Sequence, residues 1–104
     1  MNSVQKANDL LRTTMIVTQR NQVFLTPAVV HSPHREAVIT AVRNFNDFNA
    51  SNDPHSEHDF GAVSVGNEQF FWKIDYYDDT LEYGADPHEG PVVRVLTIMR
   101  SDEY

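Results

Sequence analysis

The chain has 104 residues, of which 40% are apolar, 22% charged and 11% aromatic, and it contains no cysteine. This length predicts one domain, residues 1–104, with a modest core. Disulfides, thiolate nucleophiles and cysteine-type zinc sites are excluded. No apolar run approaches the length of a membrane span, and residues 1–6 lack the apolar stretch of a secretory signal, so we expect a cytoplasmic protein.

The formal net charge of −7 is unevenly distributed. Residues 1–52 hold five basic and three acidic side chains, a net of +2, whereas residues 53–104 hold three basic and twelve acidic ones, a net of −9. The second half should repel nucleic-acid phosphates and attract a basic protein surface. Solubility alone is the other explanation of this acidity.

The first half of the chain predicts two helices and a hairpin. Val4, Ala7, Leu10 and Leu11 share one side of a helix over residues 3–14, which Ser3 can cap. Residues 15–18 and 23–26 read as two strands joined by a turn, the second ending at Pro27. A second helix follows.

That second helix has Ser32 at its N-cap and Pro33 at its first position. Val38, Ala41 and Val42 begin its apolar stripe, and the helix should stop between Phe45 and Phe48.

The second half predicts three strands separated by loops. A polar loop over residues 49–59 precedes strands at 60–65 and 68–77, which Gly66-Asn67 joins as a hairpin. An acidic loop over 78–91 leads to a last strand over 92–99, which is apolar on both sides and therefore central. We expect an α+β fold in the order α-β-β-α-β-β-β, an antiparallel sheet of about five strands with two helices packed on one face.

Period-two alternation assigns the core. In the strand over 68–77, Phe70, Trp72, Ile74 and Tyr76 point to one side, and Phe71, Lys73, Asp75 and Tyr77 to the other. We expect a core between this sheet and the second helix, formed by Phe70, Trp72, Ile74, Val95, Leu96, Val42 and Phe45.

The polar loop contains residue types that bind divalent metals. His55 and His58 are three residues apart, with Asp59 next to the second, and His88 could be a third nitrogen ligand. This spacing differs from that of helical zinc sites, and the alternative is a solvated turn in which Asp53 and Asp59 cap backbone N–H groups. No nucleophile motif is present, and no cofactor is expected.

Six acids lie between Asp75 and Glu89. Such carboxylates can serve as an acid–base pair, hold Mg²⁺ or Ca²⁺, imitate nucleic-acid phosphates, or only solvate the surface. Neighbouring tyrosines can add contact area beside the charge. The predicted partner-binding residues are Asp75, Tyr77, Asp78, Asp79, Glu82, Tyr83, Asp86 and Glu89.

Several segments resemble a family of small bacterial proteins of unknown function that are often encoded on plasmids and other mobile elements. They are Glu57-His58-Asp59-Phe60-Gly61, the run from Phe71 to Asp78 (FWKIDYYD), Val95-Leu96-Thr97-Ile98-Met99 and Glu103-Tyr104, with Leu25-Thr26-Pro27 and Asn52-Asp53-Pro54 as further shared features. The resemblance implies no catalytic or ligand-binding residues. Its genetic setting favours a protein that acts on host machinery.

We therefore expect a non-catalytic acidic binding protein, an inhibitor of the anti-CRISPR or anti-restriction kind that occupies a basic nucleic-acid-binding surface of a host defence complex. The alternative is a small metal-dependent enzyme or metal-binding module that uses His55, His58 and Asp59. An enzyme should gather His58, Asp59 and Asp75 in one cleft, whereas a binding protein should expose its acids on an open face.

Overall fold

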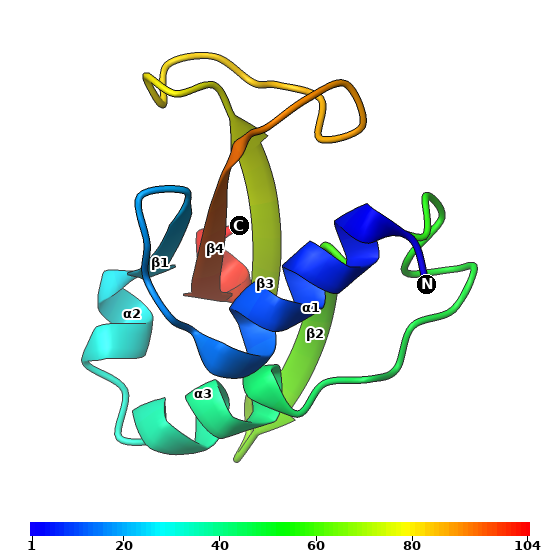
Figure 1. The fold of residues 1–104 in the computed structure, drawn as a ribbon. Coiled ribbons are helices and arrows are strands. Elements are labelled where there is room, and N and C mark those ends of the chain that lie inside the picture. Colours follow the sequence, from blue (N-terminus) through cyan, green and yellow to red (C-terminus); the bar gives the residue numbers. More distant parts are fainter.

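A four-stranded mixed sheet with helices on one face forms the framework of the molecule (Figure 1). The structure is a computed structural model that describes residues 1–104. The sheet has the order β1-β4-β3-β2. The elements are α1 (Ser3–Thr14), β1 (Asn21–Leu25), α2 (Pro27–Val30), α3 (Arg35–Arg43), β2 (Phe60–Val65), β3 (Glu68–Tyr77), β4 (Val93–Arg100) and the 3₁₀ turn η1 (Ser101–Glu103).

The first helix, α1, has the predicted bounds but a different cap. The side chain of Asn2, not Ser3, accepts the Gln5 N–H at 2.8 Å, and the Gln5 side chain accepts the Asn2 N–H at 3.0 Å. This reciprocal pair satisfies two donors at the start of the helix. The helix ends where Met15 adopts a left-handed conformation with φ of 51°.

The predicted strand over residues 15–18 is wrong, and so is the first hairpin. Met15 turns the chain out of the helix, and Ile16 and Val17 are exposed without a partner strand. Thr18 and Asn21 close a short turn through mutual backbone hydrogen bonds. The first strand is therefore β1, and it pairs in parallel with β4, Val23 opposite Leu96. The sheet has four strands and is mixed, instead of about five antiparallel ones.

A short helix, α2, lies before the predicted second helix, so the structure has three helices where two were expected. Pro27 begins the short helix α2 at its first position, a place where the missing N–H costs nothing. Ser32 Oγ accepts the His34 N–H at 3.0 Å, so it stabilises the turn before α3 and not the helix itself. The longer helix runs from Arg35 to Arg43.

The core lies between the sheet and all three helices, and the predicted inward face of β3 is confirmed. Its fully enclosed residues are Leu11, Val29, Val38, Val42, Phe70, Trp72, Ile74, Leu96 and Ile98, and Phe45 packs against them. Val95 does not belong to it, because alternation along β4 turns Val95 to the opposite face from Leu96. The central position predicted for β4 is confirmed.

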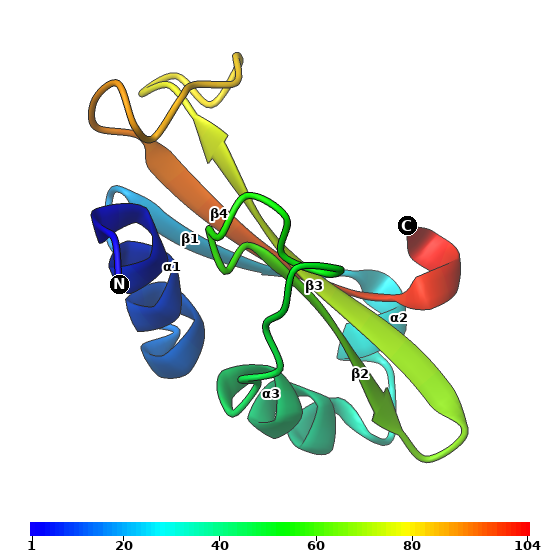
Figure 2. The same cartoon turned by 90° about the vertical axis from the view of Figure 1, so that its right-hand side faces the viewer.

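The opposite face of the sheet is only partly covered. Figure 2 shows α1 and α3 on one side of the sheet and η1 on the other. The ring of Tyr104, next to η1, makes edge contacts with Phe60 and Phe71 at centroid distances of 6.1 and 5.6 Å. None of the helices combines the length and the apolar character that crossing a bilayer requires.

Two long loops extend from this framework. Residues 44–59 run beside α1, where Asn2 and Asn8 donate to the backbone carbonyls of Ser56 and Glu57. Residues 78–92 connect β3 to β4 and arch beyond the end of the sheet (Figure 1). We call the first the polar loop and the second the acidic loop.

Candidate functional site

The acidic loop is a folded projection of the sheet. Its base continues β3 as a short hairpin, in which Tyr77 pairs with Gly84 and the Ala85 N–H donates to the Tyr76 carbonyl at 3.2 Å. Asp78 accepts hydrogen bonds from the backbone and hydroxyl of Thr80, and the hydroxyl bond is 2.6 Å long. This side-chain hydrogen bond lowers the pKa of Asp78. The loop therefore presents its side chains from a hydrogen-bonded turn.

The eight predicted partner-binding residues belong to β3 and to the acidic loop. Asp75 lies on β3, on the face away from the helices, and pairs with Lys73 at 2.9 Å. The half-buried members are Asp75, Tyr77 and Asp78, and the exposed ones are Asp79, Glu82, Tyr83, Asp86 and Glu89. Asp79 is compensated by Arg20 at 2.9 Å. Asp75 and Tyr77 belong to β3, and the other six residues belong to the acidic loop, which is the projecting part of the predicted site.

The residues of the alternative metal site are not gathered. His55 is exposed, and His58 lies with Nδ1 3.0 Å from both carboxylate oxygens of Asp9. Asp59 lies beside Glu57, and its backbone carbonyl accepts the Ile74 N–H, whereas Asp75 pairs with Lys73. No three His, Asp or Glu side chains lie close enough to hold a metal ion. The partner of His58 is thus a residue of α1 and not its sequence neighbour Asp59.

A polar network that sequence reasoning missed ties the acidic loop to the helices. Asn8 is fully buried, and it donates to the Glu57 carbonyl at 2.9 Å and to the Tyr76 hydroxyl at 2.8 Å. Its own side-chain oxygen accepts from Arg94 Nε at 2.9 Å. The Tyr76 hydroxyl donates to Glu57 at 3.0 Å. The other carboxylate oxygen of Glu57 lies 3.1 Å from His88 Nε2, on the acidic loop.

Burial governs the charges of this network. It raises the pKa of the Tyr76 hydroxyl and lowers the pKa of Arg94. A sequence signal for the network did exist, because Asn8 and Arg12 follow Val4 at intervals of four residues on the inward side of α1. Polar residues on an apolar helix face indicate buried hydrogen bonds.

Asp59 provides a test of this electrostatic picture. Burial, and then the neighbouring carboxylate of Glu57, raises the pKa of Asp59 from its usual 3.8 to about 6. A carboxyl group with a raised pKa in the folded protein stabilises the fold below its unfolded pKa, and this contribution is lost as pH rises from about 4 to about 6. We expect Asp59→Asn to increase the free energy of unfolding at pH 8.

The full shift would correspond to roughly 3 kcal/mol, but Asp59 is half-exposed, and solvent screening reduces the expected gain to about 1 kcal/mol. Urea denaturation should show this gain at pH 8 and none near pH 4. Asp47→Asn, a change at an exposed acid, should have no effect at either pH. A D59N variant less stable than the wild type at pH 8 would show that the charged carboxylate is well solvated.

Comparison with known protein families shows which family the chain is similar to. Residues 17–103 match the family described as Protein of unknown function (DUF3768), a region that starts after α1 and includes every strand of the sheet. No curated protein and no solved structure was found to match the chain. Because the matched region covers most of the 104 residues, the chain belongs to the DUF3768 family.

Proposed function

We propose that this protein is a non-catalytic binding protein whose acidic loop docks on a basic protein surface. The observation that supports this most is the composition of the projecting segment. Between Lys73 and Arg94 the chain has six acidic side chains and no lysine or arginine. Only Asp75 and Asp79 of these six pair with a basic residue.

Apolar side chains within the acidic loop also support a protein partner. Leu81 is 48% exposed and Tyr83 is 68% exposed, and both lie among the loop's carboxylates. A surface that served only for solubility would not need large exposed apolar groups. Tyrosine is enriched among the residues that contribute most to protein interfaces, and surrounding charge accelerates encounter with an oppositely charged partner.

The finer proposal concerns the partner. A basic protein surface that normally holds nucleic-acid phosphates is the natural counterpart of a projecting, uniformly acidic loop. We propose that such a surface belongs to a host defence complex of the CRISPR or restriction type and that the protein acts as an inhibitor from a mobile element. The same charge disfavours direct binding to nucleic acid.

The test uses two variants that change the net charge equally. Glu82→Lys/Glu89→Lys places the change on the acidic loop, and neither side chain makes a hydrogen bond or ion pair that would be lost. Glu36→Lys/Asp47→Lys makes the same change at exposed positions in α3 and the polar loop. Both variants should keep the thermal stability of the wild type, because exposed charges contribute little to folding.

Immobilised wild-type protein should retain its partner from bacterial extract, and duplex DNA should displace that partner. The control variant should retain the same protein. The loop variant should associate about tenfold more slowly or not at all, an effect that weakens above about 0.3 M salt. If both variants bind as the wild type does at low salt, the acidity serves solubility alone and the proposal is wrong.

A further inference from the structure

The outer edge of β2 is one of the two ends of the sheet, and β3 pairs only with its inner side (Figure 1). The two strands form an antiparallel ladder that a tight turn at Gly66 closes. Hydrogen bonding alternates along such a ladder, and the Asp59 carbonyl accepts the Ile74 N–H at 2.8 Å, so the odd-numbered residues of β2 face β3. The N–H and C=O groups that face outward belong to Phe60, Ala62 and Ser64.

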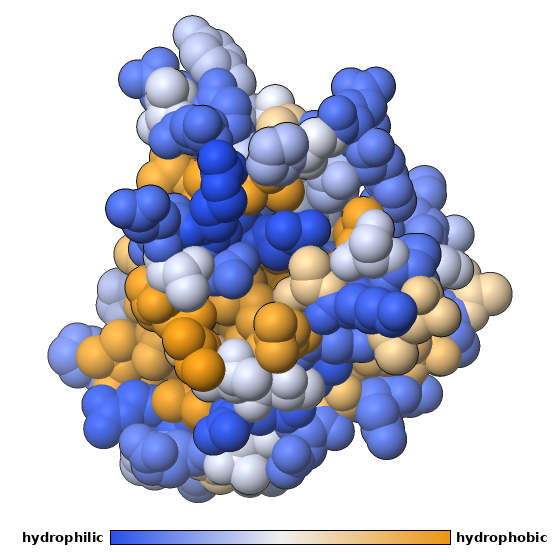
Figure 3. Space-filling model, viewed as in Figure 1, coloured by the Kyte–Doolittle hydropathy of each residue, from blue (hydrophilic) through white to orange (hydrophobic).

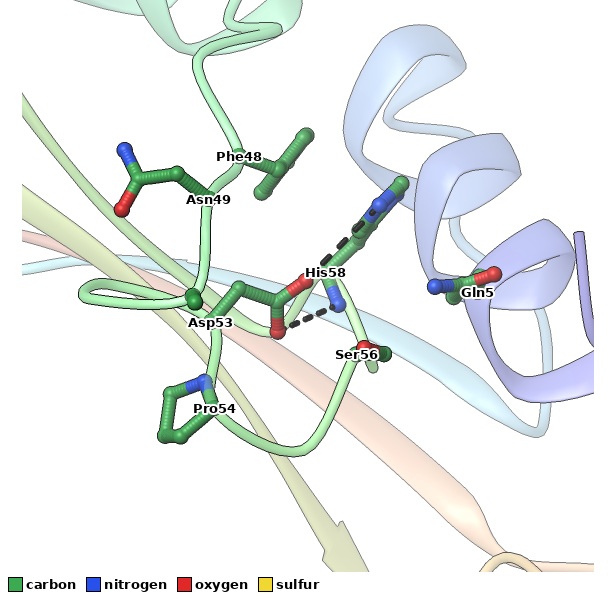
Figure 4. A pocket seen from close by; sticks show the side chains of 8 residues that line it. Gln5, Phe48, Asn49, Asp53, Pro54, Ser56 and His58 are labelled. Atoms are coloured by element: carbon green, nitrogen blue, oxygen red, sulfur yellow. Dashed lines mark hydrogen bonds and ion pairs between the residues drawn. The ribbon is translucent and has the colours of Figure 1, made fainter.

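These outward backbone groups have no partner elsewhere in the chain. Ala62 and Ser64 are exposed, and Phe60 is half-buried. The polar loop, which leads into β2, makes its hydrogen bonds with itself and with α1 instead. Within it, the Asp53 carboxylate accepts the His58 N–H at 3.2 Å (Figure 4). Free N–H and C=O groups along a strand bind another β-strand, so the edge defines the chemistry of its partner.

The sequence of β2 lacks the features that usually prevent such pairing. Exposed edge strands commonly have a charged residue, a proline or a bulge. The sequence FGAVSV has no charge and no proline, and its register with β3 is continuous over all six residues. The other edge strand, β1, has five residues, and its first residue, Asn21, is already bonded to Thr18 in a turn. The edge of β2 is therefore the one that is open to a partner along its whole length.

The side chains of β2 are complementary in size to those of a second β2 strand, antiparallel to the first about a two-fold axis at Ala62. In this register Phe60 lies opposite Ser64 of the second copy, and Val63 lies opposite Gly61. Each larger side chain thus meets a smaller one, and the small side chain of Ala62 meets its own copy on the axis. No charged residues of the two strands face one another. The three outward residues of each copy all find hydrogen-bond partners, because this register pairs outward residues with outward residues.

Apolar groups beside the edge would lose contact with water in the same arrangement. The Tyr104 side chain, which is 77% exposed, makes an edge contact with the Phe60 ring on the helix-free face. On the helix face, the Trp72 ring covers Gly61, so Val63 of the second copy would pack beside it. We propose that the edge of β2 binds a second copy of this chain, which joins the two four-stranded sheets into one continuous sheet.

The size and the charge of the contact predict a weak dimer. A strand of six residues is about 20 Å long, and its pairing buries far less than the roughly 800 Å² per partner of a stable complex. The net charge of −7 on each copy opposes association. We expect a dissociation constant on the order of 100 µM, and tighter association as salt screens this repulsion.

Sedimentation equilibrium measures the association, and backbone amide NMR shifts on dilution locate it. Between about 1 mM and about 10 µM protein, the shifts should centre on the amides of Phe60, Ala62 and Ser64. The amides of Val23 and Leu25, on β1, should stay unchanged. Raising the salt concentration to about 0.3 M should strengthen the dimer at least twofold, the opposite of the effect expected for binding through the acidic loop.

Two substitutions at the axis test the pairing by different means. Ala62→Pro removes an outward N–H, which the ladder with β3 does not use, and should weaken the dimer at least tenfold. Ala62→Lys keeps this N–H but places two like charges opposite one another, and should have a similar effect. Gln69→Lys is the matched control. It adds the same charge at an exposed position of β3, next to Ser64 but away from the edge, and should leave the dimer at least as strong as in the wild type.

Three results would overturn the proposal. They are a protein that stays monomeric at about 1 mM, dilution shifts that centre on β1, and an A62K variant that dimerises as the wild type does. The A62K comparison keeps the test valid if A62P does not fold. The Glu82→Lys/Glu89→Lys variant should still dimerise, because β2 contains no residue of the acidic loop. Failure here would therefore leave the proposed function untouched, and the reverse also holds.

Discussion

Replacing Trp72 by alanine is expected to lower the free energy of unfolding by about 3–5 kcal/mol. The indole is fully buried at the junction of several elements. It makes edge contacts with Phe45 and Phe48, at centroid distances of 5.5 and 6.1 Å, and the Arg12 guanidinium lies 5.2 Å from its ring. Opposite it, Gly61 leaves the space that the indole fills, since a methyl group there would overlap Trp72 and lie 2.9 Å from Phe45.

Trp72→Phe is the matched control for this cavity. The indole N–H is buried without an acceptor, so phenylalanine removes an unsatisfied donor while it keeps most of the apolar volume. The control should cost less than about 1.5 kcal/mol. Urea denaturation followed by circular dichroism suits both variants, because Trp72 is the only tryptophan and cannot report on its own removal. A loss below about 1 kcal/mol in W72A would contradict the core described here.

Removal of Arg12 should be as damaging, for electrostatic reasons. Its guanidinium donates to the carbonyls of Val42 and Arg43 at 3.0 and 3.1 Å, and to the carboxylate of Asp9 at 3.1 Å. The Arg12 side chain is only 4% exposed. Arg12→Met preserves much of the apolar stem but removes the charge that compensates Asp9 and the side-chain donor to the carbonyls of Val42 and Arg43. Loss of one member of a buried pair costs about 3–5 kcal/mol, and we expect a loss in that range.

A second substitution separates charge from packing in this result. Asp9→Asn in the Arg12→Met background removes the uncompensated carboxylate, and the double variant should recover part of the lost stability through a coupling of about 0.5–3 kcal/mol. Lys6→Met, an exposed change on the same helix, should stay within about 0.5 kcal/mol of the wild type. If R12M lost less than about 1 kcal/mol, water would be satisfying the Asp9 carboxylate and the two carbonyls.

Local patterns predicted the elements whose neighbours are close in sequence. The hairpin of β2 and β3 follows from alternation on both sides of Gly66, which has the positive φ of 60° that such a turn requires. The pairing of β1 with β4 could not be read in this way, because a strand's distant partner is chosen by the packing of the whole sheet. The left-handed helix end at Met15 was also not predicted, because methionine is seldom left-handed and a helix end of this kind usually has glycine.

The same distinction between local patterns and distant contacts applies to the candidate sites. The exposed acids of the acidic loop were found because composition alone indicates a charged surface. The contact of His58 with Asp9 was not found, because the two residues come from the polar loop and from α1 and meet only when the chain folds. The hydrogen bond between Asn8 and Arg94 joins residues 86 positions apart. No motif in either segment encodes that contact, although the polar residues on the inner side of α1 indicated that some such contact exists.

An exposed apolar surface lies at the end of α1, where the predicted strand over residues 15–18 is absent. Leu10, Ile16 and Val17 are 61%, 64% and 58% exposed, and Figure 3 shows the apolar side chains gathered over this part of the molecule. A hairpin strand over residues 15–18 would have paired with β1 and placed Ile16 and Val17 along a sheet. With that edge absent, the outer side of β1 has no neighbouring strand.

The place of β4 at the centre of the sheet has a consequence for biosynthesis. This strand forms one ladder with β1 and another with β3, yet it is translated after every other strand. While it is still inside the ribosome, the inward residues of α1, α2 and α3 have no Leu96 or Ile98 to pack against, and β1 has no partner at all. The nascent chain must therefore keep its apolar faces away from other proteins until translation of this domain is nearly finished, and the sheet then closes in one late, long-range step.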